Sequence, residues 1–273
     1  MPNRKNFKNV FYILLTFICS CSSAKKTSNA NIDLTNLKFT VEEAPDWTAL
    51  LKRTSGWYGG DGIFAIPLNG KENISASDTD KNLIIFSDSM VGEIENGKPK
   101  ISKNSIHNTV GIFEGEEPKN EKIKFYWDTD ARGKPETIFI PHTVSSQPSD
   151  YYWLGDGFVN IAKDNTTYIF AYKMKNLDPK DDWSFTLTKT NLIAIPAGSK
   201  PPFKDQRQIE TPLSFHGSQP DSYGTFGAGI FVNTKSAGVK NGDGYVYVYG
   251  LKGKAKNLIV GRVKPEHFED FDK

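Results

Sequence analysis

Residues 57–64 read Trp-Tyr-Gly-Gly-Asp-Gly-Ile-Phe, and residues 153–159 repeat the phrase as Trp-Leu-Gly-Asp-Gly-Phe-Val. A third version at 226–231, Phe-Gly-Ala-Gly-Ile-Phe, keeps the glycines but has Ala228 in place of the acid. Each copy is followed by an apolar strand pattern, a turn and a second strand pattern. A supersecondary unit that recurs at such intervals indicates a repeat architecture, and all-β repeats of this size are typical of propeller blades.

The sequence from residue 33 onward predicts an all-β fold. It is rich in aromatic residues, Thr, Gly and Asn, and no long stretch follows the helical period. Asn-Gly pairs at 69–70, 96–97 and 241–242 suit tight hairpin connections. Short helices are expected only at 46–53 and after Pro265.

The three repeats predict three sheets. We expect strands at 63–67, 83–88, 109–114 and 123–127 in the first sheet, at 158–161, 167–173, 184–189 and 192–196 in the second, and at 230–233, 245–251 and 258–263 in the third. A closed propeller has about 4 to 8 blades. The sequence therefore predicts a chain truncated after about three blades, and the alternative is a compact open-sheet protein with exposed strand edges.

The first 20 residues read as a bacterial secretory signal. A basic start containing Arg4, Lys5 and Lys8 precedes an apolar run at 10–18. That run is shorter than the roughly 20 apolar residues needed to span a bilayer. We therefore expect a signal peptide at 1–20, a polar tether at 21–32 and the β-domain at 33–273.

Residues 18–21, Ile-Cys-Ser-Cys, are similar to the lipobox of bacterial lipoproteins. The resemblance implies lipidation of Cys21 and a location in the cell envelope, at the outer membrane of a Gram-negative bacterium. The alternative is an ordinary cleaved signal whose cysteines are incidental. Both cysteines of the chain fall in this segment, so we expect no disulfide framework in the folded domain.

Charge and motif content exclude several kinds of ligand. Loss of the signal removes three basic residues and no acid, which changes the net charge from +2 to −1. A near-neutral body without a basic stripe gives no reason to expect nucleic acid as a partner. The four histidines show no zinc spacing, and no phosphate-binding glycine loop occurs. We therefore expect neither a metal nor a cofactor.

The Gly-Asp-Gly motifs and the phrase Ile-Phe-Ser-Asp-Ser-Met-Val-Gly at 85–92 resemble a superfamily of five-bladed propellers. It includes the arabinanase and xylosidase family, the invertase family and related surface lipoprotein domains of unknown function. The likeness is closest to these lipoprotein domains and covers most of residues 54–270. It implies a five-bladed propeller of the glycosidase type whose central funnel engages a carbohydrate.

In the catalytic members of that superfamily, the innermost strands of the first three blades each present one carboxylate to the funnel. The resemblance places Asp61 at the first position, as base or nucleophile, and Asp156 at the second, as the tuning carboxylate. Ala228 stands where the general acid should be, and loss of general acid catalysis costs about 10² to 10⁴ in rate. Alternative acids lie just upstream, namely Glu210, His216 and Asp221.

Four further residues are candidate ligand contacts. Trp57 and Trp153 precede the two acids and could stack on sugar rings, whereas Asp88 and Asn108 could donate or accept hydrogen bonds at the funnel mouth. Each has a structural alternative, because aromatic rings also fill cores and short polar side chains also cap turns. We expect a lipid-anchored envelope protein that binds, and in one interpretation hydrolyses, a carbohydrate. The other interpretation is a non-catalytic glycan-binding or scaffold lipoprotein.

Overall fold

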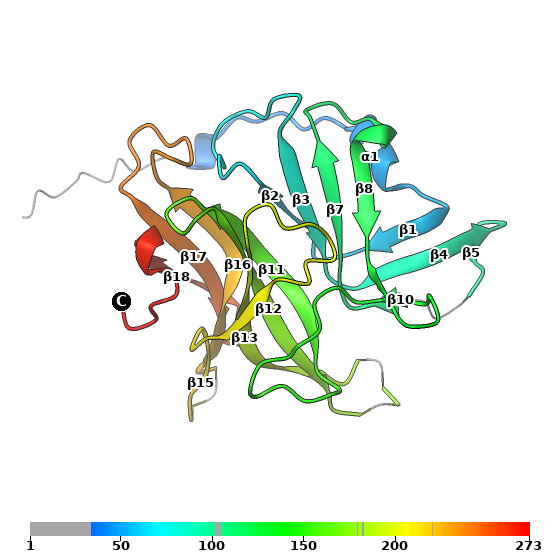
Figure 1. The fold of residues 1–273 in the computed structure, drawn as a ribbon. Helices are drawn as coiled ribbons and strands as arrows, with labels where there is room; N and C mark the ends of the chain where they lie inside the picture. Colours follow the sequence, from blue (N-terminus) through cyan, green and yellow to red (C-terminus); the bar gives the residue numbers. More distant parts are fainter. Residues whose placement is uncertain (1–33, 102–104, 179, 182, 220) are drawn as a thin grey trace, which may run out of the picture. The chain divides into compact units, whose positions relative to one another are not determined.

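A computed structural model describes residues 34–101, 105–178, 180–181, 183–219 and 221–273 (Figure 1). The predicted signal peptide, the lipidation site Cys21 and the tether lie outside the described residues. The chain divides into two units, residues 1–43 and 44–273. The described part of the first unit contains one short 3-10 helix, η1 (Leu34–Asn36). No helix of the described residues is long and apolar enough to cross a membrane.

The second unit consists almost entirely of antiparallel sheets, which confirms the all-β prediction. The predicted helix at 46–53 is α1 (Pro45–Leu51), which begins with a proline at its first turn. Leu50 of this helix is buried against Phe113 and Ile123. The end of the chain forms η3 (Pro265–His267), and one further 3-10 turn is η2 (Asn120–Lys122).

Three four-stranded antiparallel sheets form the body of this unit (Figure 1). The first sheet has the order β2 (Phe64–Pro67), β3 (Lys81–Phe86), β7 (Thr109–Glu114) and β8 (Ile123–Tyr126). The second has β11 (Tyr151–Asn160), β12 (Thr166–Asn176), β13 (Phe185–Ile195) and β14 (Arg207–Glu210). The third has β15 (Ser214–His216), β16 (Tyr223–Asn233), β17 (Tyr245–Lys252) and β18 (Asn257–Val263).

Two further sheets are formed by strands that precede, interrupt or follow those of the first sheet along the chain. β1 (Ser55–Gly60) pairs with β4 (Ser89–Glu95), which also pairs with β5 (Lys98–Pro99) and β6 (Ser105–Ile106). β9 (Asp128–Thr129) and β10 (Pro135–Glu136) form a two-stranded ribbon. These short pairings were not predicted from the sequence.

The second sheet differs from the prediction in one respect. The strands expected at 184–189 and 192–196 are one continuous strand, β13, and the fourth strand is β14. No glycine or proline interrupts Thr190-Asn191, and the side chains of both residues are buried. A turn there would remove them from the core, so the strand continues.

Each repeated motif coincides with an irregularity in a strand. The pairing register shifts between Leu154 and Gly157 in β11 and between Phe226 and Gly229 in β16. In the first copy the register shifts between Trp57 and Gly59, and the chain then leaves β1 before β2 begins. The shift places Asp156 and Ala228 at the same position within β11 and β16.

The first and third sheets pack on opposite faces of the second. One core lies between the first and second sheets and contains Ile66, Leu83, Tyr152 and Ile169. The other lies between the second and third sheets and contains residues such as Phe158, Phe170, Val232 and Val246. The middle sheet is thus covered on both faces, and β11 lies beside both β2 and β16.

Candidate functional site

The backbone brings two carboxylates together at the end of β1. The amide of Asp61 donates to the carbonyl of Asp88 at 3.1 Å, and the amide of Ser87 donates to the carbonyl of Asp61 at 2.8 Å. Asp61 is exposed, and Asp88 is partly buried. Partial desolvation of its carboxyl raises the pKa of Asp61, and the nearby charge of Asp88 adds to that effect. The charge of Asp88 therefore acts on the carboxyl of Asp61.

Aromatic side chains hold Asp88 in place. The indole Nε1 of Trp153 donates to Asp88 Oδ1 at 2.9 Å, and His107 Nδ1 lies 3.2 Å from the same oxygen. The His107 ring stacks on Tyr151, with centroids 3.8 Å apart. Tyr151 in turn meets Trp153 edge-on. We call Asp61, Asp88, His107, Tyr151 and Trp153 the acid–aromatic cluster.

A cavity of about 300 Å³ adjoins the acid–aromatic cluster. His107 and Tyr151 form part of its wall, and Glu136, Thr137 and Asp150 contribute polar groups. This volume is at the lower end of the range for small-molecule sites. A ligand at the acid–aromatic cluster would therefore meet carboxylate oxygens, ring faces and an adjoining recess.

Asp156 belongs to a different pair of carboxylates. Its Oδ1 accepts a hydrogen bond from its neighbour Gly157 N at 2.8 Å, and its Oδ2 accepts one from Ile230 N at 2.7 Å. Because Ile230 lies on β16, this carboxylate connects the second sheet to the irregular part of the third. Burial raises the pKa of Asp156, although these two hydrogen bonds oppose the effect.

The partner of Asp156 is Glu72, on the loop between β2 and β3. Burial raises the pKa of Glu72 to about 8, and the charge of Asp156 contributes to the rise. The Oε1 atom of Glu72 is buried and has no hydrogen-bond partner among the described residues. Sequence reasoning missed Glu72, since Asn69-Gly70-Lys71-Glu72 reads as an ordinary polar turn.

The two acids that the repeats predicted as a catalytic pair have different charged neighbours. Asp61 is influenced by Asp88, whereas Asp156 influences Glu72. Of the predicted ligand contacts, Asp88 and Trp153 lie with Asp61 in the acid–aromatic cluster. Asp156 forms backbone contacts between two sheets instead.

The prediction that Trp57 and Asn108 contact a ligand needs correction, because both side chains are buried and bind other parts of the fold. Trp57 is 2% exposed and stacks on Phe125 at a centroid distance of 4.4 Å. Asn108 is fully buried, donates to the carbonyls of Phe139 and Tyr152 at 3.0 and 3.1 Å, and accepts from Phe139 N at 2.8 Å. Both side chains are enclosed by the protein, so neither is accessible to a ligand.

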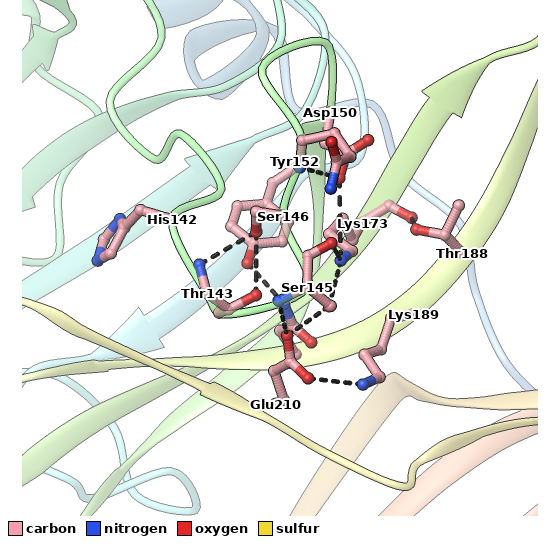
Figure 2. A network of polar contacts seen from close by, with 12 residues as sticks. His142, Thr143, Ser145, Ser146, Asp150, Tyr152, Lys173, Thr188, Lys189 and Glu210 are labelled. Atoms are coloured by element: carbon pink, nitrogen blue, oxygen red, sulfur yellow. Dashed lines mark hydrogen bonds and ion pairs between the residues drawn. The ribbon is translucent and has the colours of Figure 1, made fainter.

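Glu210, a candidate for the missing acid, lies in a polar network around Ser145 (Figure 2). Its Oε2 accepts from Lys189 Nζ at 2.7 Å, and its Oε1 accepts from the amide of Ser145 at 2.8 Å. These contacts, with that of the Ser145 hydroxyl, hold the pKa of Glu210 far below its usual range. The lowered pKa keeps Glu210 ionised, which is unfavourable for a general acid.

The other two candidates for that acid are peripheral. His216 is exposed on the short strand β15, and an oxygen of Asp221 accepts from the amide of Lys254 at 2.9 Å. The described residues also contain no group of three or more His, Cys, Asp or Glu side chains that could hold a metal ion.

Residues 45–271 match the sequence profile of a family described as "Domain of unknown function (DUF5005)". No curated protein matches the sequence. The fold is similar to a crystal structure from Bacteroides ovatus ATCC 8483, described as that of a "putative hydrolase", with a TM-score of 0.51 and 18% sequence identity. The similarity covers 80% of this chain and 52% of that chain, so this chain spans about half the length of the Bacteroides ovatus protein.

Proposed function

We propose that this chain, which belongs to the DUF5005 family, binds carbohydrate at the acid–aromatic cluster. The observation that carries the proposal is the position of Asp88, which Trp153 and His107 fix between aromatic rings. Sugar hydroxyls donate hydrogen bonds to carboxylates, and the C–H faces of sugar rings pack on aromatic side chains. Ligand sites combine a few placed polar groups with apolar and aromatic walls in this way.

The test is retention on a panel of immobilised glycans. Asp88→Asn keeps the size of the side chain but removes its charge, and Trp153→Phe removes the indole donor. Both variants should lose at least tenfold in affinity for any glycan that the wild type binds. Asp164→Asn is the matched control, because Asp164 is an exposed acid outside the cluster. A wild-type protein that binds no glycan, or an Asp88→Asn variant with unchanged affinity, would refute the proposal.

Hydrolysis of a glycosidic bond is the second candidate function. It is favoured by the raised pKa of Asp61 beside Asp88. Glycosidases use two carboxyl groups whose surroundings set their pKa values apart, one as acid and one as base or nucleophile. In this pair Asp61 keeps its proton to higher pH than an ordinary aspartate, which reverses its predicted role as base. Asp61→Asn should therefore abolish turnover and retain binding, whereas a pure binding protein has no turnover to lose.

We further propose that the three sheets correspond to three blades of a propeller. Three features support this: each sheet has four antiparallel strands, β11 lies beside both β2 and β16, and the register shift recurs at the repeated motif. The close approach of the two sheets also explains why residue 155 is a glycine, since a Cβ on Gly155 would lie 2.5 Å from the Gly227 carbonyl oxygen. A side chain there would force β11 and β16 apart.

Lipid attachment at Cys21 and an envelope location complete the proposal. Their support is the basic, apolar and Ile-Cys-Ser-Cys order of the first 21 residues. Metabolic labelling with a fatty acid should mark the wild type and a Cys19→Ser variant. Cys21→Ser should lose the label, and labelling of Cys21→Ser would contradict the assignment.

A further inference from the structure

A second cavity lies between the first and second sheets and shares no lining residue with the recess beside the acid–aromatic cluster. Its volume is about 570 Å³, against about 300 Å³ for that recess, and is well within the range of small-molecule sites. Residues of β3, β7 and β8 line one side. The start of β12, the end of β13 and the loop residues 196–201 and 203 line the other. We call this space the intersheet cavity.

Most of the wall of the intersheet cavity is apolar. Leu83, Ile195 and Phe203 line it and are buried members of the core between the first and second sheets. Ile112 and Tyr126 also line it and pack against that core, although they are only partly buried. The core therefore opens into the cavity at this point. Side chains that face an unfilled space lose dispersion contacts there, and an apolar ligand would restore them.

Two exposed lysines supply the charge of the intersheet cavity. Lys81 begins β3, and Lys200 lies on the loop after β13. Lys200 belongs to none of the ion pairs between described residues. Lys81 Nζ lies 3.3 Å from Glu114 Oε2, but both side chains are about half exposed, and such pairs contribute little to stability. A ligand can therefore compete for the Lys81 ammonium, which has three N–H donors.

The intersheet cavity offers no negative charge to balance these lysines. Among the described residues, no aspartate or glutamate lines it. Its short polar side chains are Asn165, Thr167 and Ser199, and the hydroxyl of Ser199 already donates to Asp205. A sugar fits such a wall poorly, because its many hydroxyls would lose water without enough hydrogen-bond partners. A ligand with an apolar body and a single negative charge matches the wall.

We propose that the intersheet cavity binds a small amphipathic carboxylate with an aliphatic body, of the chemical class of the medium-chain fatty acids. The aliphatic body packs on the apolar wall, and the carboxylate accepts charge-assisted hydrogen bonds from Lys81 and Lys200. The carboxylate therefore contributes affinity that a neutral molecule of the same length lacks. This binding site is separate from the acid–aromatic cluster and does not depend on carbohydrate binding there.

The test is isothermal titration calorimetry of the full chain with octanoate and with octan-1-ol, which has the same aliphatic length without the charge. The wild type should bind octanoate saturably and at least tenfold more tightly than octan-1-ol. The double variant Lys81→Gln, Lys200→Gln should lose at least tenfold in affinity for octanoate and leave the affinity for octan-1-ol unchanged. Lys235→Gln is the matched control, because Lys235 is an exposed lysine that does not line the cavity.

A second variant fills the intersheet cavity without touching its charge. Ala197 is an exposed residue of the wall, so Ala197→Trp should weaken binding of both ligands at least tenfold. Ala131→Trp is its control, at an exposed position between β9 and β10. Circular dichroism and melting curves establish that each variant is folded.

Three results would overturn the proposal. They are a wild type without saturable octanoate binding, equal affinities of the wild type for octanoate and octan-1-ol, and octanoate affinity that neither the double lysine variant nor Ala197→Trp changes. Asp88→Asn, the variant that tests glycan binding, should leave the affinity for octanoate unchanged. Failure at the acid–aromatic cluster is thereby distinguished from failure at the intersheet cavity.

Discussion

Glu72 remains protonated at neutral pH because burial and the charge of Asp156 raise its pKa to about 8. Its ordinary value is 4.5, so between pH 4.5 and about 8 the folded chain binds more protons at this site than the unfolded chain. The contribution to stability is therefore complete below pH 4.5 and is lost as the pH rises through about 8.

Glu72→Gln removes this titration and leaves a neutral side chain of the same size. Relative to the variant, the wild type should lose on the order of a few kcal/mol of unfolding free energy between pH 5 and pH 9. Urea unfolding of both proteins at the two pH values measures the difference. Parallel curves would show that Glu72 ionises in the folded protein as it does in the unfolded one.

The residue scale also shows where sequence reasoning succeeds and where it fails. The motif drew attention to Asp61 and Trp153, and the following phrase to Asp88, and these three lie together. The same motif could not distinguish the buried Trp57 from the partly exposed Trp153. Which tryptophan is accessible depends on Phe86 and Phe125, the rings that pack on Trp57, and they come from distant strands.

At the scale of elements, a buried lysine fixes the loop that precedes β11 (Figure 2). Lys173 is 3% exposed, and its Nζ donates to the carbonyl and the hydroxyl of Ser145 at 3.0 and 2.6 Å. The same nitrogen lies 3.8 Å from Asp150, which is next to Tyr151 of the acid–aromatic cluster. This contact network therefore positions one wall of the candidate site.

Lys173→Met should destabilise the fold by about 3–5 kcal/mol, because it leaves the buried carboxylate of Asp150 without its cation. Lys175→Met is the control, as Lys175 is an exposed residue of the same strand. Chemical denaturation measures both changes, and hydrogen exchange of the Ser145–Tyr151 amides reports whether the loop is released. Equal stabilities of the two variants would mean that Lys173 is not needed to hold the loop.

Strand positions were predictable where turn residues bound an apolar run. β3, β7 and β17 each begin and end within two residues of their predicted limits. The prediction failed for β13, because Thr190 and Asn191 are residues that favour turns as well as strands. Their burial explains why the strand continues, because Asn191 Nδ2 donates to the hydroxyl of the buried Tyr152, on β11, at 2.7 Å. Tyr152 and Asn191 are 39 residues apart, so the sequence around Asn191 gives no indication of this contact.

For the second unit as a whole, the repeats predicted three main sheets of antiparallel strands. They could not predict that Asp156 would bind the third sheet. This contact lies next to the register shift in β16, where the amide of Ile230 donates to the carboxylate of Asp156. Repetition in a sequence reveals equivalent backbone positions, but the neighbour on the next sheet decides what each side chain does.

The two cores between the sheets predict that residues 44–273 unfold as one cooperative unit. Phe158 is 1% exposed in the core between the second and third sheets, 4.7 Å from the ring of Phe268. Phe158→Ala should cost about 3–5 kcal/mol, and Val144→Ala, at a fully exposed position, should cost almost nothing. Since the middle sheet belongs to both cores, hydrogen exchange should accelerate equally in β3 and β17. Acceleration confined to β17 would show that the third sheet opens independently of the first.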